Sequence, residues 1–193
     1  MSLLAAWQHR ATPGDCVRLL HLSYPTVQRW FRRFRAALPR EEEKLRGEVE
    51  VDEAFFGKRK HMNQVLVMGM RERSGKLRLR HIPDREEGTL ERVLLQEVDT
   101  ATRLHTDAWS GYLNVSWYGY AHEVCNHAQK DFSGTARIES EWSRMKRHMR
   151  KLYGRFHLPY LEELLREWEA RANFPEVFTT PTAYLKVCLF RVR

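Results

Sequence analysis

Three acidic residues stand where their carboxylates could converge on one pocket. Asp52 falls inside a β-forming run, and a charged residue within a buried strand normally has a partner or a metal. Asp107 follows another predicted strand, and the carboxyl ends of strands are where α/β sheets bind ligands. Several carboxylates together can hold two divalent cations about 3.5–4 Å apart, an arrangement used for phosphodiester cleavage. These residues therefore predict metal-assisted chemistry on a phosphate ester.

Glu139 is the third acid of this set, because of its place on a helix predicted over residues 137–153. The helix carries an apolar stripe with spacings of four, three, four and three, formed by Ile138, Trp142, Met145, Met149 and Leu152. At about 100° per residue, Glu139 lies on one flank of the stripe, and Lys146 lies on the same flank two turns later. Glu141 lies on the opposite flank. The alternative interpretation makes Glu139 and Glu141 ordinary surface charges of an amphipathic helix.

The elements that must position these acids read β-β-β-α-β-α-β-α-α. Apolar alternation predicts strands, and the second and third of these form a hairpin around Ser74-Gly75. The predicted strands cover 48–56, 65–71, 76–82, 102–107 and 120–126, and the predicted helices cover 89–98, 137–153 and 159–172, with a helical turn at 110–114. Three antiparallel strands followed by alternating helices and strands predict a ribonuclease H-like α/β fold, a mixed sheet with flanking helices.

The first 38 residues predict a separate helical module that resembles a helix-turn-helix. Thr12-Pro13 starts one helix, and Ser23 can cap a second that runs to about Leu38. Apolar residues at helical spacing on the second helix are Val27, Trp30, Phe31 and Phe34, and its polar face carries Gln28, Arg29, Arg32, Arg33 and Arg35. A basic second helix is typical of one that enters the DNA major groove. The alternative is a basic amphipathic helix that packs on the next domain.

Composition and charge limit the class of partner. The net charge is +8 and the isoelectric point about 9.6, which favours a polyanion such as nucleic acid. No run approaches the roughly 20 apolar residues of a membrane span, and we expect no signal peptide. The cysteines, Cys16, Cys125 and Cys188, form no CxxC pair, so neither a disulfide framework nor a zinc ribbon is expected. We expect a cytoplasmic, nucleoid-associated protein.

A charged run bracketed by Pro39 and Gly47 marks a linker. We therefore predict a helix-turn-helix-like DNA-binding module over residues 1–42 and a catalytic domain over residues 43–193.

Several ordered motifs resemble the catalytic domain of bacterial insertion-sequence transposases of the ISXO-like group. The resemblance covers roughly residues 48 to 174, and four elements in the right order form a specific signal. They are Val51-Asp52-Glu53 followed by Gly57-Lys58, Thr106-Asp107-Ala108-Trp109-Ser110-Gly111-Tyr112, Cys125-Asn126-His127, and Ile138-Glu139-Ser140-Glu141-Trp142-Ser143 with Lys146. The tail beyond Phe174 matches nothing in the group, and Thr135-Ala136-Arg137 stands where many relatives carry a polar residue, often Asn.

The resemblance implies a DDE transposase, in which Asp52, Asp107 and Glu139 ligate two Mg²⁺ ions, with Mn²⁺ as a possible substitute. Trp109 and Tyr112 are expected to pack behind Asp107. Residues expected to contact DNA are Lys146, Arg29, Arg32, Arg33, Lys58, Lys60, Asn126 and His127.

The partners implied are double-stranded DNA, as terminal inverted repeats and target, and a second copy of the chain in a homodimer on DNA. Two alternatives remain open: a related metal-dependent nuclease, and a catalytically decayed or repurposed DNA-binding protein.

Overall fold

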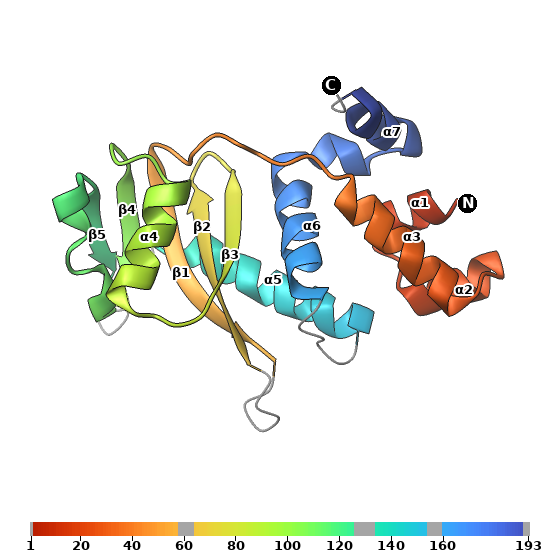
Figure 1. Cartoon of the computed structure of the whole chain (residues 1–193), viewed down its shortest axis with the longest axis horizontal. Helices are drawn as coiled ribbons and strands as arrows, with labels where there is room; N and C mark the ends of the chain where they lie inside the picture. Colours follow the sequence, from red (N-terminus) through yellow and green to blue (C-terminus); the bar gives the residue numbers. More distant parts are fainter. Residues whose placement is uncertain (1, 58–63, 126–133, 154–159, 191–193) are drawn as a thin grey trace. The chain divides into compact units, whose positions relative to one another are not determined.

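The computed structural model describes residues 2–57, 64–125, 134–153 and 160–190 (Figure 1). The chain forms two compact units, one made of Met1–Glu41 with His148–Arg193 and the other of Glu42–Arg147. We call them the helical unit and the sheet unit. Within the described ranges, no helix combines the length and the apolar character needed to cross a membrane.

The sheet unit is built on one five-stranded mixed sheet in the order β3-β2-β1-β4-β5. The strands β1, β2 and β3 are antiparallel neighbours, whereas β1, β4 and β5 run parallel. Their bounds are β1 Glu48–Phe56, β2 Val65–Glu72, β3 Leu77–Ile82, β4 Arg103–Asp107 and β5 Ala121–Cys125. The turn between β2 and β3 contains Gly75 at φ 128°, a conformation that favours glycine. This topology confirms the predicted ribonuclease H-like fold.

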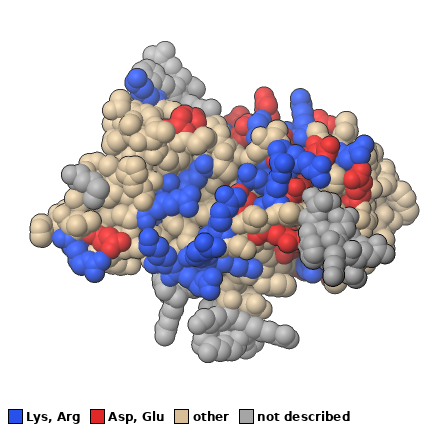
Figure 2. Space-filling model, turned by 180° about the vertical axis from the view of Figure 1, so that it is seen from behind, with Lys and Arg blue, Asp and Glu red and all other residues tan. Residues whose placement is uncertain are grey.

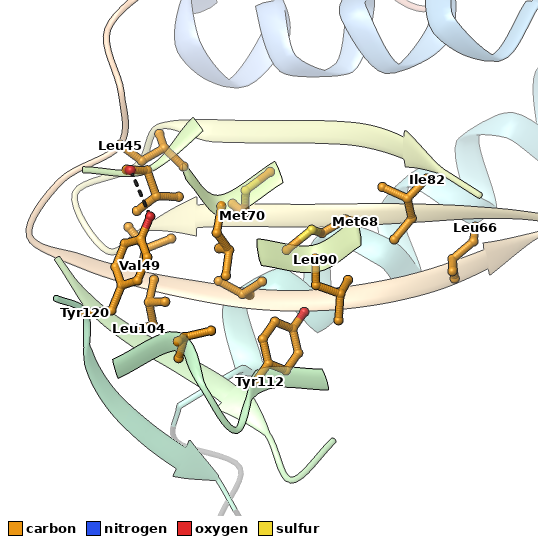
Figure 3. Close-up of a cluster of buried hydrophobic side chains, with 14 residues drawn as sticks. Leu45, Val49, Leu66, Met68, Met70, Ile82, Leu90, Leu104, Tyr112 and Tyr120 are labelled. Atoms are coloured by element: carbon orange, nitrogen blue, oxygen red, sulfur yellow. Dashed lines mark hydrogen bonds between the residues drawn. The ribbon is translucent and has the colours of Figure 1, made fainter. Parts of the chain in front are cut away.

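Two helices cover opposite faces of this sheet (Figure 1). On one face α4, Glu87–Glu97, packs on an apolar core that joins all the central strands (Figure 3). Residues of that core include Val49, Val51, Met68, Met70, Leu90, Leu94, Leu104 and Tyr112, each at most 1 % exposed. The other face receives α5, Ala136–Tyr153, through Ile138, Trp142 and Met145, which are buried. The predicted apolar stripe is therefore the packing face of α5.

The helical unit begins with α1 Leu3–Gln8, α2 Pro13–Leu20 and α3 Tyr24–Ala36. Its second part is formed by α6 Leu161–Asn173, the short 3₁₀ helix η6 Pro175–Phe178 and α7 Pro181–Phe190. Thr12 and Asp15 form a capping box at the start of α2, and the Ser23 side chain accepts a hydrogen bond from the Thr26 N–H at the start of α3. Both predicted helix starts are thus confirmed by their caps.

A buried carboxylate holds the helical unit together. Glu167 of α6 is 4 % exposed and accepts from Arg35 Nε at 2.7 Å and from Trp7 Nε1 at 3.2 Å, while Arg171 Nη2 lies 2.9 Å from it. Burial acts to raise the pKa of Glu167, but Arg35 and Arg171 outweigh it and lower that pKa to about 2. The surrounding aromatic core of Trp7, Phe34, Phe178 and Tyr184 joins α1, α3, η6 and α7.

The helical unit corrects three expectations. It contains α1 and α7, which the sequence did not predict. Arg35 was expected on the exposed basic face of α3 but is 2 % exposed, because Glu167 of α6 draws it inward. Trp30 was expected on the packing face but is 39 % exposed.

The compact units also differ from the predicted division at residue 42. That division assigned everything after residue 42 to one catalytic domain. In the structure His148–Arg193 pack with the N-terminal helices, because α6 contacts α3 and α7 contacts α1.

We expect Glu167→Gln to lower the free energy of unfolding by about 3 kcal/mol or more, because it removes the hydrogen-bonded counter-charge of two buried guanidinium groups, those of Arg35 and Arg171. Urea unfolding followed by circular dichroism measures the change. The control is Glu176→Gln, which removes an exposed carboxylate of the same unit and should change the stability by about 0.5 kcal/mol or less. Equal losses in the two variants would contradict the assigned role of Glu167.

Because the pKa of Glu167 is lowered in the folded chain, its stabilising contribution is present above the unfolded value of 4.5 and is lost as the pH falls towards about 2. The acid-dependent loss of stability in that window should therefore be smaller in Glu167→Gln than in the parent chain.

Candidate active site

The pairing of β1 with β4 sets Asp52 level with Asp107. The parallel ladder joins Glu48 to Arg103 and Glu50 to His105, so partners differ by 103 − 48 = 55 positions. The same difference separates Asp52 from Asp107, since 107 − 52 = 55. The ladder ends at Glu50, whereas β1 continues along β2 to Phe56. The two carboxylates therefore stand two residues beyond the last paired position, where β4 leaves β1.

Glu50 attaches the first turn of α5 to β1. Its side chain is 1 % exposed, and its Oε2 accepts from the backbone N–H groups of Arg137 at 2.9 Å and Ile138 at 3.1 Å. A carboxylate is favourable here because the first N–H groups of a helix lack partners within the helix and the helix dipole is positive at this end. Glu50 thus fixes the beginning of α5 against the sheet.

Asp52 forms the second attachment of α5. It lies on the same face of β1 as Glu50, since side chains two apart share a face. Its Oδ2 accepts from the indole Nε1 of Trp142 at 2.8 Å. Glu139 lies on α5 between the residues bound by Glu50 and the one bound by Asp52, so these two contacts bring the third acid towards the other two.

Gly69 allows Trp142 to approach the sheet closely. It is the β2 partner of Asp52 in the antiparallel ladder. A Cβ added at Gly69 would lie 2.4 Å from the Trp142 ring and 2.8 Å from Ile138 Cδ1, closer than side chains pack. The absence of a side chain at this position is therefore required for the contact between α5 and Asp52.

The three acids influence one another electrostatically. Burial raises the pKa of Asp52, and the negative charges of Asp107 and Glu139 raise it further, against hydrogen bonds from Trp142 and from the Glu53 backbone. Glu139 accepts from the Thr135 hydroxyl at 2.9 Å, and Asp107 accepts from the Trp109 N–H at 3.1 Å. Each acid is therefore held by a donor of its own, while Asp107 and Glu139 both repel Asp52.

The three acids have side chains of a type that can bind a divalent cation. Three carboxylates offer the hard oxygen ligands that Mg²⁺ and Mn²⁺ prefer. In the part of the chain that the structure describes, no group of three or more His, Cys, Asp or Glu side chains is already gathered as a metal site. Convergence on one cation would require the side chains to turn from their present donors.

Glu53 points to the opposite face of the sheet from Asp52 and has its own partners. Its side chain is 1 % exposed, Arg85 Nη2 lies 2.6 Å from its Oε2, and the Tyr112 hydroxyl donates to its Oε1. Burial raises the pKa of Glu53 to about 7, although Arg85 acts to lower it. Arg85 was missed in the sequence, because it lies in the connection before α4 and belongs to no motif or periodic pattern.

The aromatic residues expected behind Asp107 differ in their surroundings. Tyr112 is 1 % exposed and packs in the core as predicted, but Trp109 is 41 % exposed. The Arg85 guanidinium lies 4.2 Å from the centre of the Trp109 ring.

The predicted DNA-contacting residues are distributed over both units. Lys146 of α5 lies over the Phe56 ring at 5.4 Å, on the Asp52 face of the sheet. Arg29, Arg32 and Arg33 are exposed on α3 in the helical unit. Arg32 pairs with Glu163 at 2.8 Å, and Arg33 lies 5.1 Å from the centre of the Trp30 ring. The residues Lys58, Lys60, Asn126 and His127 lie outside the described ranges.

Further cations line the exposed side of α5, among them Arg144, Arg147 and Arg150. Figure 2 shows Lys and Arg side chains exposed at several places on the side of the molecule that faces away from the viewer in Figure 1. Such a surface is suited to a polyanion.

Comparison with known proteins gives one family match. The family model described as an ISXO2-like transposase domain matches residues 44–173. No curated protein matches the chain. Among solved structures, the catalytic core domain of BIV integrase is 14 % identical, with a TM-score of 0.46, covering 64 % of this chain and 80 % of that one. A chain of the simian T-cell lymphotropic virus intasome in complex with PP2A regulatory subunit B56 gamma is 10 % identical, with a TM-score of 0.49, covering 96 % of this chain and 74 % of that one.

Gly69→Ala should lower the free energy of unfolding of the sheet unit by about 1–3 kcal/mol, because the added methyl group displaces Trp142 and Ile138. Urea unfolding provides the measurement. The matched control is Gly88→Ala in α4, where an added Cβ meets nothing within 4 Å and stability should be unchanged or slightly higher. A Gly69→Ala chain as stable as the parent would show that α5 does not depend on this close contact.

Proposed function

Because the chain belongs to the ISXO2-like transposase domain family, we propose that it cleaves the ends of an insertion sequence and joins them to target DNA in a metal-dependent reaction. The observation that carries this proposal is the placement of Asp52, Asp107 and Glu139. Strand register aligns Asp52 with Asp107, and the attachments of α5 to β1 support the proposal that Glu139 acts together with them.

In this proposal Asp52, Asp107 and Glu139 hold a pair of Mg²⁺ ions, for which Mn²⁺ can substitute. When bound, the ions activate the attacking hydroxyl group and stabilise the leaving oxygen of the phosphodiester. Trp142 orients Asp52 through its indole N–H, and Thr135 holds Glu139 through its hydroxyl. Lys146 presents a cation on the same face of the sheet, where it would contact a DNA phosphate.

The helical unit would recognise the DNA ends. In a helix-turn-helix the basic recognition helix enters the major groove, and α3 carries the exposed Arg29 and Arg33. Arg32 is held by Glu163, so its contribution to DNA binding should be smaller than theirs. Lys58, Lys60, Asn126 and His127 are retained as further predicted contacts.

Joining two transposon ends requires both to be held together, which favours a homodimer on double-stranded DNA. The terminal inverted repeats and the target would then be the two DNA partners.

Asp52→Asn should abolish Mg²⁺-dependent cleavage of DNA that carries the transposon end, because it removes one metal-binding charge from the site. DNA binding should remain within about twofold of the parent, since the helical unit is untouched. The control is Asp99→Asn, which removes a surface carboxylate 3.5 Å from Arg46 and should cut normally. Gel analysis of end-labelled DNA and a mobility-shift titration give the two readouts. Undiminished cleavage by Asp52→Asn would refute the assignment of the site.

Arg29→Ala combined with Arg33→Ala should weaken DNA binding more than Lys44→Ala combined with Arg46→Ala, which removes the same charge from the exposed linker. Each lost phosphate contact should also reduce the slope of log affinity against log salt by roughly 1. Fluorescence anisotropy at several salt concentrations measures both effects. A larger loss in the linker variant would move the DNA-binding surface away from α3.

A further inference from the structure

We propose that Glu53 retains the guanidinium group of Arg85 and thereby keeps Asp107 available to a cation. This inference rests on the proposed function, because it takes Asp107 to be a metal-binding acid. It gives Glu53, which directly follows Asp52, a role other than that of a metal ligand.

The side chains of Glu53 and Asp52 point to opposite faces of the sheet. Adjacent residues of a strand point to opposite faces of the sheet, so Glu53 faces the α4 side while Asp52 faces α5. The Tyr112 hydroxyl occupies Glu53 Oε1, and two nitrogens of Arg85 occupy Oε2, Nε at 2.7 Å and Nη2 at 2.6 Å. Both carboxylate oxygens are therefore engaged by donors within the protein.

Arg85 lies between two acids, Glu53 and Asp107. Its Nη2 lies 2.6 Å from Glu53 Oε2 and 3.7 Å from Asp107 Oδ2. The shorter contact is a hydrogen-bonded ion pair with a buried carboxylate, whereas the longer one exceeds hydrogen-bond length. Glu53 is thus the preferred partner of Arg85, and Asp107 is the next acid within reach.

Trp109 holds Arg85 in this position. The Trp109 ring lies under the guanidinium at 4.2 Å, and its Nε1 donates to the Arg85 carbonyl at 3.2 Å. The Trp109 backbone N–H donates to Asp107 Oδ1. Arg85 therefore stays beside Asp107 whatever its partner, and the charge on Glu53 decides which acid it pairs with.

If the Glu53 charge is removed, the guanidinium is expected to close the remaining distance to Asp107. A cation would then compete with an arginine for the same carboxylate. If Arg85 is removed as well, that competition disappears. Recovery of Mn²⁺ binding in the double variant separates the proposal from two alternatives. If Glu53 were a metal ligand, or if its role were only structural, the double variant would bind Mn²⁺ no more tightly than Glu53→Gln.

The test is Mn²⁺ binding by the full-length chain without DNA, followed by the loss of the electron paramagnetic resonance signal of free Mn²⁺. We expect Glu53→Gln to raise the dissociation constant by about tenfold or more, and Glu53→Gln combined with Arg85→Gln to return it to within about threefold of the parent. Arg85→Gln alone should bind Mn²⁺ at least as tightly as the parent. Glu48→Gln, the same change elsewhere on β1, should have no effect. Thermal melting followed by circular dichroism checks that each variant is folded.

A double variant as weak as Glu53→Gln, or an Arg85→Gln chain that binds Mn²⁺ more weakly than the parent, would overturn the proposal. If Glu53→Gln does not fold, the comparison of Mn²⁺ binding between Arg85→Gln and the parent still tests the proposal. Failure of the proposed function gives a different pattern: the parent binds no Mn²⁺, or Asp52→Asn binds it as well as the parent does.

Discussion

The repulsion of Asp52 by Asp107 and Glu139 is the interaction that the rest of the sheet unit has to offset. Asp52, Asp107 and Glu139 would separate if nothing held them, and the negative charges of the other two raise the pKa of Asp52. Each is fixed by a different donor: an indole N–H, a backbone N–H and a threonine hydroxyl. These donors come from α5, from the segment after β4 and from the residue before α5. The stability of the surrounding fold therefore maintains an arrangement that is electrostatically unfavourable, and under the proposed function a bound cation would neutralise it.

Other buried acids in this chain stabilise the fold, because neighbouring hydrogen-bond donors and cations balance their charges. Glu50 receives the first N–H groups of α5, and Glu167 receives two guanidinium groups and an indole. Removing one partner of such a buried group costs far more than removing a surface pair. Burial alone therefore does not distinguish a functional acid from a structural one. Glu167 is surrounded by donors and cations, whereas Asp52 has two acids near it in addition to its donors, and their charges raise its pKa.

Much of the sheet unit could be predicted from sequence, because local patterns determine it. Alternation gave the bounds of β1 as observed, and the apolar stripe of α5 identified its packing face. Contacts between distant segments were beyond such patterns. Helical spacing placed Arg35 on the polar side of α3, yet Glu167, 132 residues away, pairs with Arg35 and buries it. Arg85 gains its position from Glu53 and Trp109 in the folded chain alone. The helix α1 has only six residues, too few for a periodic signal.

The register of β1 and β4 has a consequence for how the chain can change in length. The alignment of Asp52 with Asp107 is set by ladder hydrogen bonds, and each acid stands two residues past Glu50 or His105, the last paired positions. Insertions in the connections between these strands would alter the 55-residue interval without moving either carboxylate. One residue gained or lost inside either strand would instead turn its acid to the other face of the sheet. Homologous chains with quite different spacing between these acids could therefore keep them aligned, whereas a single-codon deletion within β4 would separate them.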